Sequence, residues 1–215
     1  MARVGLTTDR VVALAIELIE QEGYDALSMV RLASMAGVRV PSLYKHVSGI
    51  GDLQHLLAIE GMQRRGEQLE RAASPTRTSR EAVHALGQAY RTFAQQHPGL
   101  DEATMRSPTP DEPRLRVAME PTLTTVFTVL DRCGVPEEAR IAAARFVHAS
   151  LRGFVDLERR ETLRLGGSVE TSFTFLLDGL HAGLTASSAR ATPAPHPSGL
   201  SGPTHRRAPG GPSSR

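Results

Sequence analysis

The amino-acid sequence predicts an all-α protein in which a small N-terminal domain of three helices precedes a longer helical bundle. Apolar side chains recur every three or four residues along most of the 215-residue chain, as on helices that bury one face. Residues 28–47 contain two short helical segments on either side of Gly37, and clusters of Pro, Gly and Ser separate the longer segments. Hydrophobic residues make up 40% of the chain and Trp is absent, so the core must consist mainly of Leu, Val and Ala.

The first predicted helix begins at a threonine and ends at a glycine. Thr7 or Thr8 caps it, Asp9 lies in the first turn, where the helix dipole favours an acid, and Gly23 ends it. Its apolar stripe consists of Val11, Leu14, Ala15, Leu18 and Ile19.

The segment from Ser28 to Val47 has the pattern of a DNA-reading helix-turn-helix motif. Ser28 caps the first helix, Ala33 is small enough for the second helix to cross close to it, and Gly37 suits a turn position with positive φ. The reading helix runs from Pro41 to about Val47, since the first turn of a helix tolerates proline. The residues expected on the inner faces are Val30, Leu32, Val38, Leu43 and Val47. We therefore expect the chain to bind DNA.

Five further helices are predicted, over residues 50–71, 80–96, 113–133, 137–163 and 168–186. His97-Pro98-Gly99 ends the second of these helices, and Pro121 is expected to kink the third. The fourth is rich in small residues that allow close helix approach, namely Ala142, Ala143, Ala144, Ala149 and Gly153. Together with the last helix, it predicts a dimer interface.

The remaining features limit the class of protein. Residues 187–215 are rich in Pro, Gly and Ser, which predicts a disordered tail. An alternative interpretation is that the arginines of this tail attract DNA weakly and without sequence specificity. The single cysteine, Cys133, excludes an internal disulfide and fits a reducing cytoplasm. No signal-peptide pattern and no run of 18 apolar residues is found, so no membrane partner is expected.

The usual sequence patterns of enzymes are missing. Glu81-Ala-Val-His84 is a single Glu-x-x-His motif, whereas a di-iron bundle needs two and further glutamates. The sequence contains no phosphate-binding Gly loop, no paired cysteines for zinc and no Gly-x-Ser-x-Gly motif. We therefore expect no catalysis, no metal and no cofactor.

The first helix, Thr8 to Gly23, and the string Gly37-Val-x-x-Pro-x-Leu-Tyr-x-His-Val47 resemble the TetR family of transcriptional repressors. The likeness covers residues 6–66. Arg152-Gly-Phe-Val-Asp-Leu-Glu158 and residues 173–184 resemble a subgroup named for a Trp…His-Gly motif, with Arg152 in place of its His and without its Trp. The resemblance implies an all-α homodimer with a four-helix bundle across the two-fold axis and an effector cavity in each subunit. It divides the chain into a DNA-binding domain, residues 6–66, and an effector-binding and dimerisation domain, residues 67–186.

The resemblance also implies which side chains meet double-stranded DNA. The residues expected to face base edges are Arg39, Val40, Pro41 and Ser42, and those expected at phosphates are Tyr44, Lys45 and His46. For Arg39 the alternative is a phosphate contact, for Val40 and Pro41 it is packing, and for His46 it is a cap on the next helix. Ser28 either binds a phosphate at its helix start or only caps the helix.

An effector pocket is expected to include Tyr90, Phe93, Met105, Met119, Phe127 and His148. At helical spacing such residues also make an ordinary core. The sequence thus predicts a bacterial, cytoplasmic repressor, associated with the nucleoid when bound, that binds a palindromic operator as a dimer. An apolar small molecule would release it. The alternatives are an activator, a regulator without an effector, or a helical small-molecule binder or metal enzyme that kept a DNA-binding fold.

Overall fold

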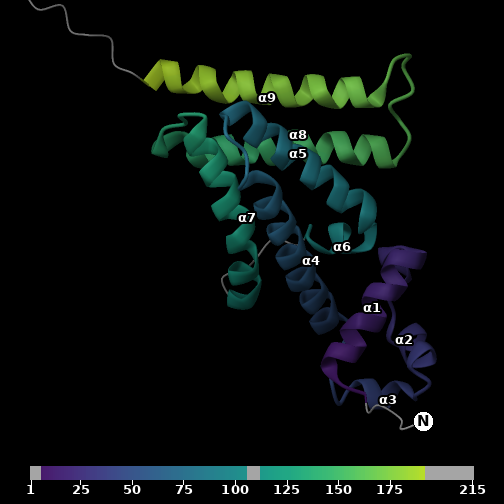
Figure 1. The fold of residues 1–215 in the computed structure, drawn as a ribbon. Helices are drawn as coiled ribbons and strands as arrows, with labels where there is room; N and C mark the ends of the chain where they lie inside the picture. Colours follow the sequence, from purple (N-terminus) through teal and green to yellow (C-terminus); the bar gives the residue numbers. More distant parts are fainter. Residues whose placement is uncertain (1–5, 106–111, 192–215) are drawn as a thin grey trace, which may run out of the picture.

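The computed structural model describes residues 6–105 and 112–191, and all regular structure within them is helical (Figure 1). In chain order the α-helices and the short 3-10 helices (η) are α1 (Thr8–Glu22), η1 (Tyr24–Ala26), α2 (Met29–Ala36), α3 (Val40–Leu43), α4 (Ile50–Ala73), α5 (Ser79–Gln96), α6 (Pro98–Ala103), α7 (Pro113–Arg132), η2 (Glu137–Ala139), α8 (Arg140–Arg159) and α9 (Val169–Ala191). The predicted all-α fold is therefore confirmed.

Three predicted helix ends are wrong. The reading helix was expected to reach Val47, but α3 ends at Leu43, because the N–H groups of His46 and Val47 both bond to the Leu43 carbonyl in a turn. The long helix was expected to reach residue 163, but α8 ends at Arg159, and Glu161 then adopts a positive φ of 53°. The last helix continues to Ala191, five residues into the predicted tail. Residues 192–215 of that tail lie outside the described residues.

The short helix α6 was not predicted at all. Pro98 ends α5 and at the same time occupies the first turn of α6, where a missing N–H costs nothing. Six residues are also too few for a periodic apolar pattern. In contrast, α7 continues through Pro121 to Arg132.

The N-terminal helices and α6 share one core. The predicted stripe of α1 is fully buried there, against Leu32 of α2, Leu43 of α3 and Leu53 of α4. Phe93 of α5 and Leu100 of α6 belong to the same cluster, so the DNA-binding end and the body are in direct contact.

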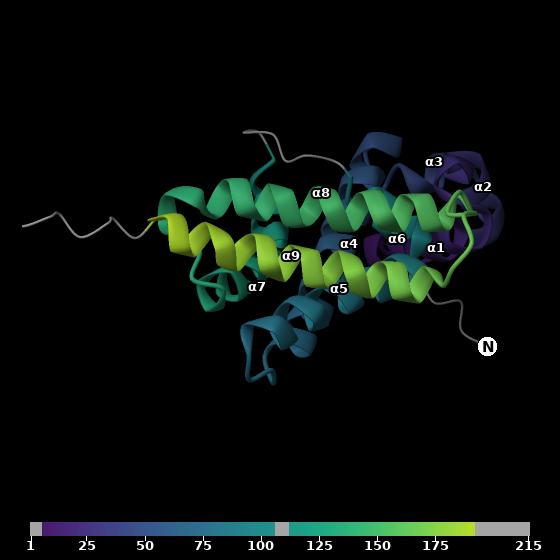
Figure 2. The same ribbon diagram turned by 90° about the horizontal axis from the view of Figure 1, so that it is seen from above.

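The body consists of α4, α5 and α7, covered at one end by α8 and α9 (Figure 1). Helices α4 and α7 approach closely, since a Cβ on Gly66 would lie 2.9 Å from the Pro121 Cβ. Figure 2, the view from above, shows α8 and α9 side by side across the top of the molecule. The helix α3 lies at the opposite end (Figure 1).

The described residues contain neither a membrane-spanning helix nor a cluster of metal ligands. No helix within 6–105 and 112–191 is long and apolar enough to cross a membrane. The same residues contain no group of three or more His, Cys, Asp or Glu side chains arranged to hold a metal ion.

Candidate nucleic-acid interface and effector region

The turn between α2 and α3 has the geometry that its sequence predicts. The Ser28 hydroxyl accepts a hydrogen bond from the Arg31 N–H and caps α2. Gly37 adopts the left-handed conformation, φ 64° and ψ 31°, which suits a residue without a Cβ. The Val38 N–H then bonds to the Ala33 carbonyl at 3.0 Å and closes the turn. Ala33 itself is buried, as expected for the point where the two helices cross.

The inner face of the motif is confirmed with one exception. Leu32, Leu43 and Val47 are buried and Val38 packs against the same cluster. Val30 was expected to be buried but is 69% exposed. It directly follows Met29, which does pack inward, so the side chain of Val30 lies on the next face of the helix.

Seven of the eight residues predicted to meet DNA lie in or beside α3 at the tip of the molecule, and the eighth, Ser28, lies at the start of α2 (Figure 1). Four of them are exposed: Arg39, Pro41, Tyr44 and Lys45. Tyr44 is the only aromatic among them, and 54% of its surface is accessible. Ser42 and His46 are half-buried, and Val40 packs partly against the core. The structure thus brings these side chains to one exposed end of the chain.

Hydrogen bonds hold the tip in place. The Thr8 hydroxyl donates to the His46 carbonyl at 3.0 Å, which links the start of α1 to the turn after α3. The Asp52 carboxylate accepts from the Ser48 N–H at 2.8 Å where α4 begins. No side chain among the described residues caps α4 at Gly49. The carbonyl of His46, not its ring, therefore makes the contact that fixes the turn.

The cations near the tip differ in their partners. Arg31 on α2 pairs with Glu22 at the end of α1, so its charge is already compensated. Within the described part of the chain, Arg39 and Lys45 form no ion pair. These two exposed cations remain available for an anionic partner such as a phosphate.

The residues predicted for an effector pocket do not form one cluster. Tyr90 and His148 are in contact, with ring centroids 6.2 Å apart in an edge-to-face arrangement. Phe93 belongs to the core shared with α1, and Met105 is exposed at the end of α6. Met119 and Phe127 lie on α7 and pack, half-buried, against two different clusters. The structure therefore brings together only one pair of the six residues.

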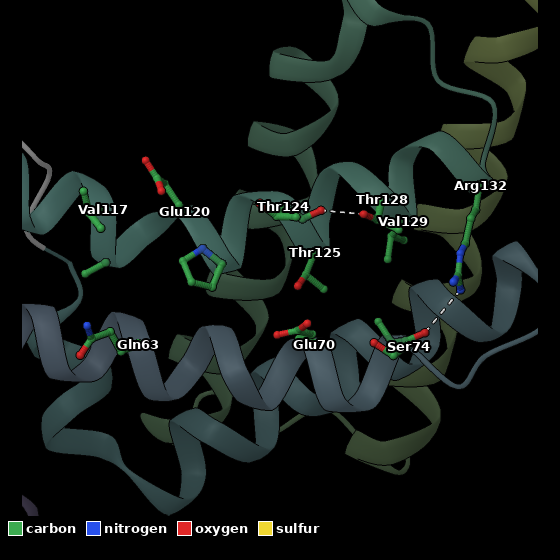
Figure 3. A pocket seen from close by; sticks show the side chains of 13 residues that line it. Gln63, Glu70, Ser74, Val117, Glu120, Thr124, Thr125, Thr128, Val129 and Arg132 are labelled. Carbon is green, nitrogen blue, oxygen red and sulfur yellow. Dashed lines mark hydrogen bonds between the residues drawn. The ribbon is translucent and has the colours of Figure 1, made fainter.

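A hollow of about 570 Å³ lies between α4 and α7 (Figure 3). Its walls include Glu70 and Glu120, a row of threonines on α7, and Arg132 at one end. Arg132 bonds to the Thr76 hydroxyl at 2.7 Å. This hollow is open and has both polar and apolar walls, and none of the six residues predicted for an apolar pocket lines it.

Helix α6 connects α1 of the DNA-binding end to the body. Glu20 of α1 accepts hydrogen bonds from the N–H groups of Gly99 and Leu100 in its first turn. Asp101, fully buried, pairs with Arg152 of α8 at 2.5 Å. A Cβ on Gly99 would lie 2.5 Å from the backbone oxygen of Ile19, so the two helices touch. A movement of α6 therefore changes its contacts with α1 on one side and with α8 on the other.

Helices α8 and α9 leave an apolar surface uncovered. Phe146 and Leu157 of α8 and Phe175 of α9 are exposed, the last by 80%. Among the small residues of the predicted dimer interface, Ala142, Ala149 and Gly153 are exposed, whereas Ala143 and Ala144 pack against the body. Exposed apolar patches of this kind mark interaction surfaces.

Comparison with known proteins identifies the family. The model of bacterial regulatory proteins of the tetR family matches residues 11–53, and the tetracyclin repressor-like C-terminal domain matches residues 83–180. The chain is 32% identical over 154 residues to the uncharacterized HTH-type transcriptional regulator Rv0681 of Mycobacterium tuberculosis, covering 71% of this chain and 70% of that protein. The chain belongs to the TetR family. The predicted family is thus confirmed, and its members are regulators of transcription that bind DNA.

Two further proteins are similar to this chain. The HTH-type transcriptional repressor DrrR1 of Streptomyces coeruleorubidus is 33% identical over 103 residues, 48% of this chain and 37% of that protein. A variant of the TetR protein of Acinetobacter baumannii, solved in complex with minocycline, is 26% identical with a TM-score of 0.63, and the match covers 85% of this chain and 98% of that one.

The residues that join α1, α6 and the body were not predicted from the sequence. Glu20 and Gly99 are far apart in the chain, and no local pattern links them. Arg65 did carry a signal, because it continues the buried stripe Ala58, Met62 and Leu69 of α4 at helical spacing. A charged residue at such a position indicates a buried polar site.

Proposed function

We propose that this TetR-family regulator is a homodimeric repressor that binds a palindromic operator and leaves it when an apolar small molecule enters the body. Its place would be the bacterial cytoplasm, on the nucleoid when bound. The observation that carries the proposal is the exposed tip around α3, where Arg39, Tyr44 and Lys45 project at the end opposite α8 and α9. The repressor DrrR1 among its relatives supports the direction of regulation.

Two kinds of contact would form at the operator, one to base edges and one to phosphates. Arg39 would reach guanine O6 and N7, and Val40 and Pro41 a thymine methyl, while Ser42 completes the base-facing set. Tyr44, Lys45 and His46 would hold phosphates and fix the register, with Ser28 at the start of α2 as a further phosphate contact. Such phosphate contacts make affinity depend on salt.

The exposed surface of α8 and α9 supports dimerisation. Phe175, Phe146 and the small residues between them would pack against the same surface of a second copy in a four-helix bundle across a two-fold axis. The two tips would then enter successive major grooves about 34–36 Å apart.

The contacts of α6 support release by an effector. A ligand that binds more tightly to one position of α6 would alter the Asp101–Arg152 pair in the body and the Glu20–Gly99 bond to α1 together. The distance between the two α3 tips of the dimer would then no longer match the operator. The complex of the Acinetobacter protein with minocycline supports a small-molecule effector for this family member too.

A gel-shift experiment tests the proposal. DNA upstream of the gene for this protein, or of an adjacent gene, is mixed with the purified chain at several salt concentrations. Binding should be specific for a palindrome and weaken with salt. Binding that ignores sequence, or none at all, would count against a repressor.

A further inference from the structure

Among the described residues of the body three arginines are buried, and two of these have carboxylate partners. Arg91 pairs with Glu158 at 2.5 Å and with Glu170 at 2.6 Å. Arg152 pairs with three acids, which are Asp101, Glu102 and Asp156. Arg65 of α4 is only 5% exposed, yet within the described residues no carboxylate oxygen lies within 4.0 Å of its guanidinium.

The groups in direct contact with Arg65 are polar but uncharged, while the charges of Asp101 and Arg152 act on it through space. Its Nη1 donates to the Thr104 hydroxyl at 2.7 Å, and its Cζ lies 5.7 Å from the centre of the Tyr90 ring. Its Nε is buried without a hydrogen-bond partner in the described structure. Burial lowers the pKa of Arg65, but a guanidinium stays protonated inside proteins. A positive charge is therefore held in the interior with incomplete hydrogen bonding.

Two neighbouring groups have unused hydrogen-bonding capacity as well. The Tyr90 hydroxyl is buried without a partner among the described residues, and burial raises its pKa, so it remains a neutral donor. Asp101 uses one carboxylate oxygen for Arg152, while its Oδ1 is buried and unpaired in the described structure. Thus α4, α5 and α6 each direct one unsatisfied polar atom into the same region.

Charge compensation is unequal in this region. Arg152 pairs with Asp101, Glu102 and Asp156, and Asp101 is the one fully buried acid among the described residues, so Arg65 is left without a carboxylate contact of its own. Partial desolvation lowers the pKa of His148, whose ring meets Tyr90. This ring therefore favours its neutral form and does not compensate the charge of Arg65. An unpaired buried charge is costly, and proteins retain such groups where they act on a ligand. A buried water would complete hydrogen bonds but would not neutralise the charge.

We propose that this centre, formed by Arg65, Tyr90, Asp101 and Arg152, binds the anionic head of the effector, a small organic acid with an apolar body. Its carboxylate would accept from Arg65 Nε and the Tyr90 hydroxyl, both of which now lack a partner. The bound acid would also compete with Asp101 for Arg152, which is the contact that holds α6 to α8. This inference rests on the proposed function, because it gives the chemical class of that effector.

A series of probes with one apolar body and three head groups tests the charge requirement. Octanoate, 1-octanol and octylamine are titrated into the full-length protein without DNA, and binding is measured by calorimetry and by the shift in melting temperature. Octanoate is expected to bind about tenfold or more tightly than 1-octanol, because hydrogen bonds to a charged group are stronger. Octylamine is expected to bind more weakly than both.

Variants assign the effect to this centre. Arg65→Met removes the unpaired charge and should abolish the preference for octanoate while leaving the melting temperature equal or higher. Tyr90→Phe keeps the ring and should reduce the preference. Arg64→Met is the matched control, since Arg64 is exposed on the same helix and pairs with Glu60. It should keep the preference of the wild-type chain.

Equal binding of octanoate and 1-octanol, no binding of octanoate, or an unchanged preference in Arg65→Met would each overturn the inference. None of these readings involves DNA. A chain that prefers octanoate but ignores every palindrome would refute the repressor and leave the anion site standing, whereas the reverse pattern would refute the anion site alone.

Discussion

Glu20 of α1 accepts a hydrogen bond from the backbone N–H of Gly99, over 3.1 Å, at the first turn of α6. Its other oxygen accepts from the Leu100 N–H at 3.2 Å. The carboxylate therefore caps a helix from a different part of the fold, at the end where the helix dipole favours negative charge. This contact joins the DNA-binding end to the body.

Removing that cap should weaken the junction. Glu20→Ala leaves two N–H groups of α6 without their acceptor, so the free energy of unfolding should fall by about 1–2 kcal/mol. Urea denaturation followed by circular dichroism measures it. Glu17→Ala, on the exposed face of the same helix, should change stability by less than about 0.5 kcal/mol. Equal losses in the two variants would show that Glu20 does not cap α6.

Gly99→Ala tests how closely α1 and α6 approach. The added Cβ would lie 2.5 Å from the Ile19 backbone oxygen, which cannot rotate away, so a loss of about 1–3 kcal/mol is expected. Gly51→Ala in α4 is the comparison, because no atom lies within 4 Å of its Cβ position. That substitution should stabilise the helix by up to about 1 kcal/mol. A Gly99 variant as stable as the Gly51 variant would contradict the close approach.

Phe175→Glu tests the dimer surface. A charge placed on each side of the two-fold axis should raise the dissociation constant of the dimer at least 100-fold, from about 2 kcal/mol or more per interface aromatic lost. Analytical ultracentrifugation reports the change. Val117→Glu is the control, since Val117 is also apolar and exposed but lies near the start of α7, outside α8 and α9. Dissociation by both variants, or by neither, would argue against this interface.

Arg39→Ala and Lys45→Ala should affect DNA binding differently. Loss of a bidentate guanine contact should cost about 1–3 kcal/mol and relax discrimination at one base pair of each half-site. Loss of a phosphate contact should weaken all sequences alike and reduce the slope of log affinity against log salt by about 1 per subunit. Binding to operators with single base changes, measured by fluorescence anisotropy, separates the two. Uniform weakening by Arg39→Ala would assign this residue to phosphate instead.

Local chemistry made the DNA-binding end predictable. Ser28, Gly37 and Pro41 each occupy a position with one backbone requirement, and the structure uses all three as expected. The prediction that Val30 lies on the inner face was wrong, because Val30 is two residues before the buried Leu32 and that spacing places it on another face of α2. The reading helix ended early because its last turn is closed by bonds to a single carbonyl.

The body could be predicted only as a set of helices. The position of Phe93 in the core with α1, rather than beside Tyr90, depends on how α5 and α6 meet the N-terminal helices. No sequence pattern specifies such contacts between distant segments. The buried charge of Arg65 is different in kind, because its place in the apolar stripe of α4 was visible in the sequence. Only the structure shows that no acid accompanies it.

DNase footprinting of the wild-type chain on the DNA upstream of its gene tests the central claim most directly. The account predicts protection of a palindrome whose two half-sites lie one helical turn apart, about 34–36 Å, and loss of that protection for Arg39→Ala with Lys45→Ala. Protection without a palindrome, or a footprint that survives the double substitution, would contradict the assignment of α3 as the element that reads DNA.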